Sequence, residues 1–436
     1  MAHPPRVSHA LPTWRSAITV LSPGLPRTLE RLLHARLADG TVVDVQLSGG
    51  RIESVVPADT LGPGNPETAL ELDGFLLLPA PADPHAHLDK ALSWDAIRPP
   101  MGDLRLAIES WHAYSHQMTV DEIADRARTQ ALTMLAHGTT AIRTHVDLLP
   151  GPDPLRGVHA LIRVREELRC LLDLQLVTLG GYLTPTEDHE SALAAGVDLV
   201  GGAPHLAPDA LTELARLLEI ARLAGVGVDV HTDESLDCDV TLDVLARAVV
   251  GWESPVSAGH CVRLGTLEGP RRDEVIADVL AAGIGVIANP ITNLYLQGWG
   301  SDVATPRGLT AVRALVDAGV RFAAGADNVR DPFNPLGRSD ALETAMLLVV
   351  AGHLSVDEAY TAVSTGARDV MGLSSGGIAP GERAELLAVR GTDLVDVVAT
   401  ASLDRYVIHA GRLVAASETH SQVAAPALLP TYPEAR

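Results

Sequence analysis

Residues 209–231 read DALTELARLLEIARLAGVGVDVH. The apolar residues of the first half recur at steps of three and four, which predicts a helix that begins after Pro208. Gly225 stands where a helix end commonly needs a left-handed residue, and the run 226–230 is short and apolar enough for a buried parallel strand. His231 follows at once. The stretch therefore predicts a helix, a turn and a strand that ends in a histidine.

The same order of helix, glycine and short apolar run recurs along the chain. Four further glycines occupy the turn position of this unit: Gly138, Gly196, Gly283 and Gly319. Two of the gaps between successive turn glycines are twice as long as the shortest one, and the runs 172–179 and 255–260 fill them. The apolar run 77–81 precedes the series. Eight strands alternating with helices over about 300 residues predict an α/β fold, a closed (β/α)₈ TIM-type barrel.

Short strand-like runs flank this region on both sides. They lie at 33–37, 42–47 and 51–56 before it, and at 384–389 and 405–414 after it. Since the two ends of a barrel chain can pair, we expect a small β-domain built from residues 31–78 and 379–416. The catalytic barrel is then expected at 79–378. The remaining ends, 1–30 and 417–436, are predicted to be flexible.

Composition narrows the class of partner. The chain has 436 residues, 47% of them hydrophobic, and its formal net charge is −22. This excess of negative charge opposes binding to nucleic acid and to anionic membranes, and a small neutral or cationic substrate fits it better. Three cysteines without a CxxC pair, and no apolar run of about 20 residues, predict a cytoplasmic protein. The oligomeric state stays open, a homo-oligomer included.

Polar residues gather where the predicted strands end. His85 and His87 are two residues apart, so on an extended chain they share one face. His231, His260 and Asp327 each end another strand. One histidine at a strand end is more often structural than a ligand, but the active sites of barrels lie at this face, where all five side chains converge. Imidazole and carboxylate ligands together suit zinc or iron(II).

Six segments in this order resemble the cytosine deaminase branch of the amidohydrolase superfamily. They are His85–Lys90, Thr144–Asp147, His231–Glu234, Ser257–His260, Asn289–Gly298 and Asp327–Gly337. The resemblance covers residues 32 to 415, nearly the whole chain. It implies a metal-dependent hydrolytic deaminase, an aminohydrolase that cleaves a C–N bond of a small heterocyclic amine.

The resemblance also implies the ligand set and the catalytic groups. One divalent metal ion, Zn²⁺ or Fe²⁺, is expected on His85, His87, His231 and Asp327. Relatives that bind two metal ions use a lysine at the end of the fourth strand. This chain has no lysine there, and the segment after its fourth strand continues to His205.

Three residues are expected to handle protons. Asp327 and His260 are suited to accept the proton of the attacking water. Glu234, three residues after the ligand His231, is the candidate carrier of that proton to the ring and to the departing ammonia. From the residues alone, Glu234 reads equally well as a solvated loop acid.

Substrate contacts are predicted at Lys90, Gln297, Asn328 and Phe333. Lys90 is the only lysine of the chain and could pair with Asp89 or bind a substrate carbonyl or carboxylate. Asn328 replaces the family's typical second aspartate, and Phe333 stands in for the aromatic residue that stacks on the ring. His145 and Asp147 are expected to orient ligands through hydrogen bonds, and His205 could take either role.

The substrate is less determined than the reaction. Cytosine deaminase has a glutamine after its third strand that reads the pyrimidine amide, whereas residues 179–183 read LGGYL here. An s-triazine-type aminohydrolase and a cyclic amidase that opens a ring amide are therefore alternatives. A Schiff-base aldolase that uses Lys90 is a more distant one, and a binding protein without catalysis is the least favoured.

Overall fold

The computed structural model describes residues 24–423. The ranges 1–23 and 424–436 lie outside the described residues, and with them most of the two ends predicted to be flexible. Just inside this boundary, β1 (Arg27–Thr28) pairs with β17 (Arg412–Ser417). None of the helices in the described part of the chain combines the length and apolar character that a membrane span requires.

Eight parallel strands follow one another in chain order around a barrel. They are β7 (Ala82–Ala86), β8 (Ala141–Asp147), β9 (Asp173–Leu179), β10 (Leu199–Val200), β11 (Gly227–Thr232), β12 (Val256–His260), β13 (Gly285–Ala288) and β14 (Arg321–Ala324).

The segment after β14 brings the last strand against the first. The backbone N–H of Asp327 donates to the His85 carbonyl at 2.9 Å, and the Asp83 carboxylate accepts the N–H of Ala326 at 3.1 Å. Gly325 precedes this contact, and a Cβ there would lie 2.7 Å from the His85 carbonyl oxygen. Only glycine allows so close an approach. The structure confirms the predicted barrel.

The first strand of the barrel differs from the prediction. The apolar run 77–81 was expected to supply it, but β6 (Phe75–Pro79) pairs with β15 (Leu386–Arg390) in a second sheet. The barrel begins instead at β7, which reads Ala-Asp-Pro-His-Ala. Its polar side chains belong to the interior of the barrel, so hydropathy gives no strand signal here.

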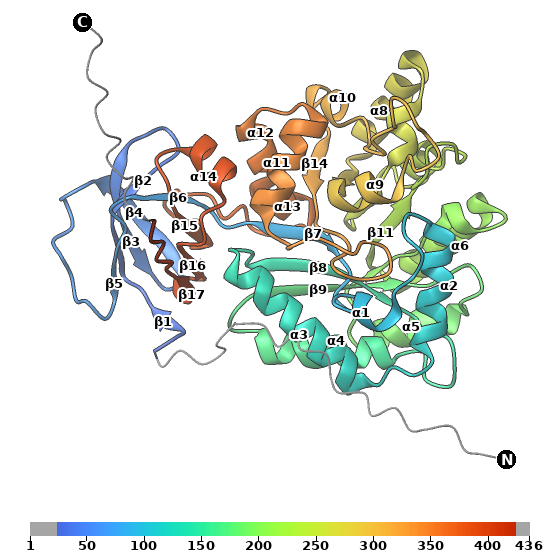
Figure 1. Cartoon of the computed structure of the whole chain (residues 1–436), viewed down its shortest axis with the longest axis horizontal. Helices are drawn as coiled ribbons and strands as arrows, with labels where there is room; N and C mark the ends of the chain where they lie inside the picture. The colour runs from blue at the N-terminus through green and yellow to red at the C-terminus, as the bar shows by residue number, and fades with distance from the viewer. Residues whose placement is uncertain (1–23, 424–436) are drawn as a thin grey trace, which may run out of the picture.

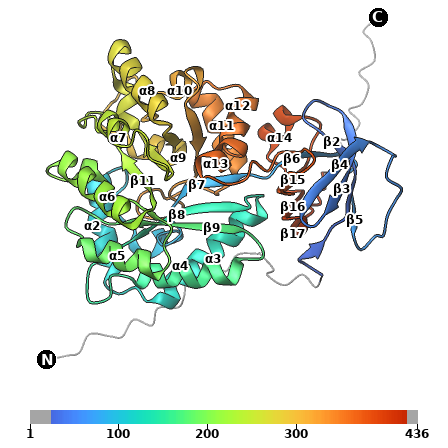
Figure 2. The same ribbon diagram turned by 180° about the vertical axis from the view of Figure 1, so that it is seen from behind.

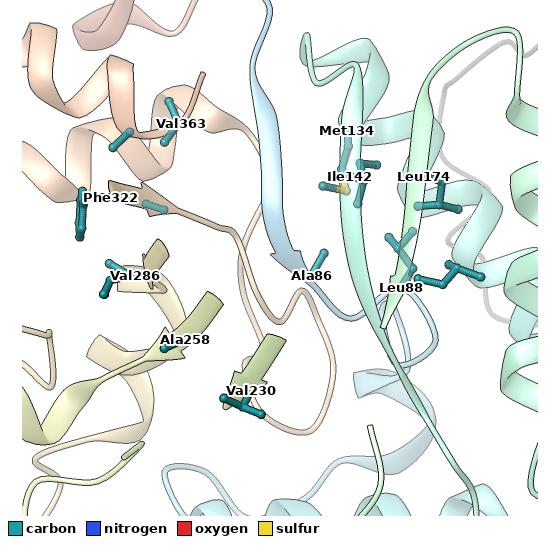
Figure 3. Close-up of a cluster of buried hydrophobic side chains, with 14 of the residues drawn as sticks. Ala86, Leu88, Met134, Ile142, Leu174, Val230, Ala258, Val286, Phe322 and Val363 are labelled. Carbon is teal, nitrogen blue, oxygen red and sulfur yellow. The ribbon is translucent and has the colours of Figure 1, made fainter. Parts of the chain in front are cut away.

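A row of apolar side chains covers the outside of four barrel strands. On β11 to β14 the successive register partners are Val230, Ala258, Val286 and Phe322. All belong to the largest buried core, which strands and helices share, and Figure 3 labels each of them. Because side chains alternate along a strand, Asp229 and His231 point into the barrel. The pattern that builds the core thus also aims polar groups inward.

Helices follow the strands and surround the barrel (Figure 1). The five turn glycines all have positive φ, as the repeat predicts. The helices are α1 (Trp94–Ile97), α2 (Leu104–Ser115), α3 (Val120–Ala136), α4 (Arg156–Leu168), α5 (Thr186–Ala195), α6 (Ala210–Ala224), α7 (Leu242–Ala248), α8 (Gly269–Ala282), α9 (Pro290–Leu296), α10 (Val312–Asp317), α11 (Ala341–Gly352), α12 (Val356–Ala362), α13 (Thr365–Val370) and α14 (Leu394–Thr400), with 3₁₀ turns at Pro204–Leu206 and Val262–Thr266.

The second sheet has nine strands and takes them from both flanks of the chain. Besides β1, β6, β15 and β17, these are β2 (Arg31–Arg36), β3 (Val42–Ser48), β4 (Arg51–Pro57), β5 (Ala69–Glu71) and β16 (Arg405–His409). Figures 1 and 2 show this sheet at one side of the barrel. Its own core includes Leu77, whereas Leu76 and Leu78 pack into the barrel core. Strand β6 therefore joins the two units.

Arg405 on β16 forms a buried ion pair with Asp340, which caps α11. Two guanidinium nitrogens lie 3.0 and 2.7 Å from the carboxylate oxygens, and a third contact reaches the carbonyl of His137. Removal of one partner leaves the other charge buried, so Arg405→Met is expected to lower the free energy of unfolding by about 3–5 kcal/mol. Urea unfolding measures this.

Arg105 on α2 supplies the control, because its ion pair with Glu109 lies in solvent. Arg105→Met should change the unfolding midpoint far less. Equal midpoints for Arg405→Met and the unchanged protein would contradict the role of the buried pair.

Candidate metal centre

The polar residues predicted at the strand ends meet at one place. His85 lies on β7 and His87 just after it, His231 lies on β11, and Asp327 follows β14. His87 Nε2 is 3.2 Å from Asp327 Oδ1 and also 3.2 Å from His231 Nε2. His85 Nε2 is 3.7 Å from the same Asp327 oxygen. All four side chains are buried.

The donor set fits a divalent metal ion. His85, His87 and His231 place one ring nitrogen each within 4.8 Å of the others, as do His85, His260 and Asp327. Both nitrogens of His85 and both oxygens of Asp327 are buried without a hydrogen-bond partner among the described residues. Burial and neighbouring positive groups hold the pKa of all three histidines well below the usual range. The rings are therefore neutral, the form that binds metals.

Glu234 lies beside this cluster, together with His260. Its Oε1 is 3.3 Å from His260 Nδ1. The same nitrogen of His260 accepts a hydrogen bond from the Asn293 amide at 3.0 Å. Burial, and to a smaller extent Asp327, raise the pKa of Glu234 well above its usual range, while burial lowers that of His260 to about 4. The raised pKa favours the protonated form of Glu234, and the lowered pKa keeps the His260 ring neutral, the form that can accept a proton. A solvated loop acid, the other interpretation of Glu234, does not describe a side chain this deeply buried.

Comparison with known proteins decides the family. Residues 105–415, more than two thirds of the chain, match the family described as "Amidohydrolase family". The chain belongs to the amidohydrolase family. It is therefore a hydrolase of carbon–nitrogen bonds, as the sequence predicts.

Relatives and solved structures agree with this assignment. A pterin deaminase from Rhizobium rhizogenes is 32% identical over 390 residues, which cover 85% of this chain and 87% of that protein. The crystal structure of 5-methylcytosine deaminase from Klebsiella pneumoniae liganded with 5-fluorocytosine superposes with a TM-score of 0.82 at 26% identity, over 90% of this chain and 99% of that one. N-isopropylammelide isopropylaminohydrolase from Burkholderia multivorans gives a TM-score of 0.76 at 28% identity, over 89% and 98%.

Lys90 of this amidohydrolase is buried beside the candidate ligands. Its Nζ is 2.7 Å from Asp147 Oδ1, 3.7 Å from Asp89 and 3.3 Å from His87 Nδ1. Burial opposes the charge, but Asp147 and Asp89 outweigh it and raise the pKa of Lys90. A charged amine is not nucleophilic, which argues against the Schiff-base alternative. The Asp147 carboxylate also accepts the Trp111 indole N–H.

The other predicted substrate contacts separate into two groups. Asn328 and Phe333 line the cavity in front of the ligands. Asn328 donates its amide to Asp331 at 2.8 Å. Gln297 instead donates its amide to the backbone carbonyl of Glu234 at 3.0 Å and is not among the residues that line this cavity within 24–423. The side chain of Gln297 therefore contacts the backbone of Glu234 and does not face this cavity.

Sequence reasoning missed a buried ion pair inside the barrel. Arg143 on β8 donates to Asp229 at 2.8 Å and to Ser257 at 2.9 Å. His145, two residues further on, lies 3.6 Å from Asp229 and packs on His85 with ring centroids 4.3 Å apart. Alternation along β8 puts Arg143, His145 and Asp147 on one face, which is the signal that could have revealed the set. His205 donates to the His231 carbonyl at 3.3 Å.

The cavity that contains these groups has a volume of about 570 Å³. The loop Gly180–Thr184, which departs from cytosine deaminase, forms part of its wall. Much of the remaining wall is apolar and comes from α2 and from the segments after β8 and β9. The sequence analysis did not foresee this apolar wall.

Gly259 provides a test of the ligand set, because the ring of His85 packs directly against it. A Cβ at Gly259 would lie 2.6 Å from His85 Cε1 and 2.8 Å from Nδ1. Gly259→Ala must displace the ring, so we expect about 10- to 100-fold weaker metal binding, the range seen when the support of a ligand is lost. Elemental analysis and competition with a chelator measure it.

Gly300→Ala serves as the control, since a Cβ there meets no atom within 4 Å. It should retain the affinity of the unchanged protein. Unaltered metal binding in Gly259→Ala would speak against His85 as a ligand.

Proposed function

We propose that this protein is a hydrolytic deaminase that replaces the amino group of a nitrogen heterocycle by oxygen and releases ammonia. The observation that carries the proposal is Glu234, a buried carboxyl group 3.3 Å from His260, placed beside four converging candidate ligand side chains. The relative named pterin deaminase, 32% identical, makes a fused ring of the pterin type the first candidate. The cavity of about 570 Å³ has room for more than a single six-membered ring.

His85, His87, His231 and Asp327 would hold one divalent ion, which we propose to be zinc or iron(II). Such an ion, when bound, supplies a hydroxide nucleophile at neutral pH, because it lowers the pKa of water to about 7. The protein's own groups must then move protons.

Asp327 and His260 accept the proton of the attacking water, since both face the ligand cluster. Glu234 protonates the ring nitrogen next to the carbon under attack, so that negative charge does not build up there. Glu234 then takes the remaining hydroxyl proton and passes it to the amino group, which leaves as ammonia as the C=O bond forms. The proton first taken from the water returns to Glu234. General acid and base catalysis of this kind contributes roughly 10²- to 10⁴-fold in rate.

Substrate orientation is assigned to Lys90, Asn328 and Phe333, which all line the cavity. Lys90 offers a donor to a ring carbonyl, Asn328 an amide to the ring edge, and Phe333 an apolar face. Gln297 acts through Glu234.

We further propose a cytoplasmic location, no nucleic-acid or membrane partner, and a composite β-domain of residues 31–78 and 379–416.

Release of an alkylamine from an s-triazine is a second candidate, supported by the structural likeness to the isopropylaminohydrolase. The loop Gly180–Thr184 supplies no side-chain amide to read a pyrimidine, which agrees with it. Opening of a ring amide is the third, since two relatives named imidazolonepropionase are 28% and 26% identical.

Glu234→Gln tests the proton carrier. The amide keeps the size of the side chain but cannot donate and recover a proton, so turnover should fall about 10²- to 10⁴-fold while the metal content stays the same. Steady-state kinetics and elemental analysis measure the two quantities. Glu190→Gln, on the exposed face of α5, is the control and should keep full turnover. Full activity of metal-loaded Glu234→Gln would refute the role.

The product distinguishes the three reactions. Metal-loaded protein should release one ammonia for each amino-pterin, amino-pyrimidine or amino-triazine that it converts, which a coupled ammonia assay detects. Conversion of a cyclic amide without ammonia would favour ring opening, and release of an alkylamine would favour the triazine-type reaction.

A further inference from the structure

The cavity has two chemically different regions. At its buried end, the ligand histidines, Glu234 and Asp327 converge. Lys90 and Asp147 mark the boundary and neutralise each other at 2.7 Å. Beyond them the wall becomes apolar. A heterocyclic amine that reacts must place its amino group at the buried end, so only other parts of the substrate can reach the apolar wall.

One face of α2 forms much of the apolar wall. Leu104, Ile108 and Trp111 follow one another at steps of four and three, so they lie on one side of the helix, and all three line the cavity. Figures 1 and 2 show α2 on the side of the barrel distant from the nine-stranded sheet. Trp111 is fixed by its indole N–H, which Asp147 accepts. Leu104 and Ile108 are only half-buried because they face this space.

Loops complete the wall on the other sides. Leu148 and Leu149 follow β8 and are buried. Tyr182, Leu183 and Leu206 form the mouth and are 48%, 81% and 45% exposed. Exposed apolar side chains of this size at the entrance of a cavity commonly mark a binding surface.

Few polar side chains interrupt this wall. Within the described part of the chain, its titratable groups beyond Lys90 and Asp147 are His112, Asp188 and the phenol of Tyr182, and none of the three is buried. A polar or charged substituent would lose its hydration here without gaining buried partners. An apolar substituent gains from the same surface.

We propose that the substrate is a heterocyclic amine that carries an alkyl or aryl substituent, and that this substituent lies against Leu104, Ile108 and Leu149. The inference rests on the proposed function for the position of the ring. The lining residues form one continuous cavity of about 570 Å³, so ring and substituent fit together. Each methylene that leaves water there should improve binding about fourfold.

A homologous series measures the effect. Amino-pterins and amino-pyrimidines without a substituent, and with methyl, propyl, pentyl and benzyl groups, are assayed for ammonia release with the metal-loaded enzyme. Their dissociation constants for metal-loaded Glu234→Gln are obtained by calorimetry, which needs no turnover. We expect kcat/KM to rise and Kd to fall about fourfold per methylene over the first members.

A matched pair of variants places the substituent. Ile108→Asn puts a polar group on the wall and should abolish the dependence of Kd on chain length. Leu106→Asn lies on the same helix, is also half-buried and does not line the cavity, so the dependence should persist.

The outcomes separate this inference from the proposed function. A Kd that falls along the series without any release of ammonia keeps the apolar site and refutes the deaminase. If Kd does not change with the length of the substituent, or if no member of the series binds, the apolar site is overturned, regardless of how fast ammonia is released. If Kd does not change along the series and Leu183→Asn converts an oligomer to monomers, the apolar site is overturned. The exposed residues of the mouth then form a contact between copies of this chain.

Discussion

The site depends on closure of the barrel between its first and last strands. The Asp327 N–H donates to the His85 carbonyl at 2.9 Å, and the Asp83 carboxylate accepts the backbone N–H groups of His85 and Ala326 at 3.1 Å each. These contacts join segments that are far apart in the chain. Because His85, His87 and Asp327 belong to these two segments, closure of the barrel also brings three of the four candidate ligands together.

Much of the fold could be predicted because local signals agree with the tertiary structure. Turn glycines followed by apolar runs precede five of the eight barrel strands, and each of these runs became a barrel strand. The first barrel strand was not predicted, because Asp83 and His85 face the interior and leave β7 without an apolar pattern. The neighbouring run in β6 is apolar on both faces because Leu76 and Leu77 pack into different cores. Local patterns mislead where function or a second domain sets the residue types.

The candidate ligands could be predicted for a similar reason, since residue type and position at a strand end are both visible in the sequence. The supporting groups could not. Arg143 reads as a polar residue in a strand, and only the tertiary structure shows Asp229 as its partner at 2.8 Å. Leu104 and Ile108 read as an ordinary core stripe, although they face a cavity. Gln297 lies in a family motif, but its contact is the backbone of Glu234.

The buried cations Lys90 and Arg143 affect the pKa of the candidate ligands. Lys90 lies 3.3 Å from His87, and the positive charges of Lys90 and Arg143 add to burial in lowering the pKa of His87 and His85. Burial acts on Glu234 in the opposite direction and raises its pKa, because the neutral form of a carboxyl group is the protonated one. The lowered pKa keeps the imidazoles in the neutral form that binds a cation, while the raised pKa of Glu234 favours its protonated form.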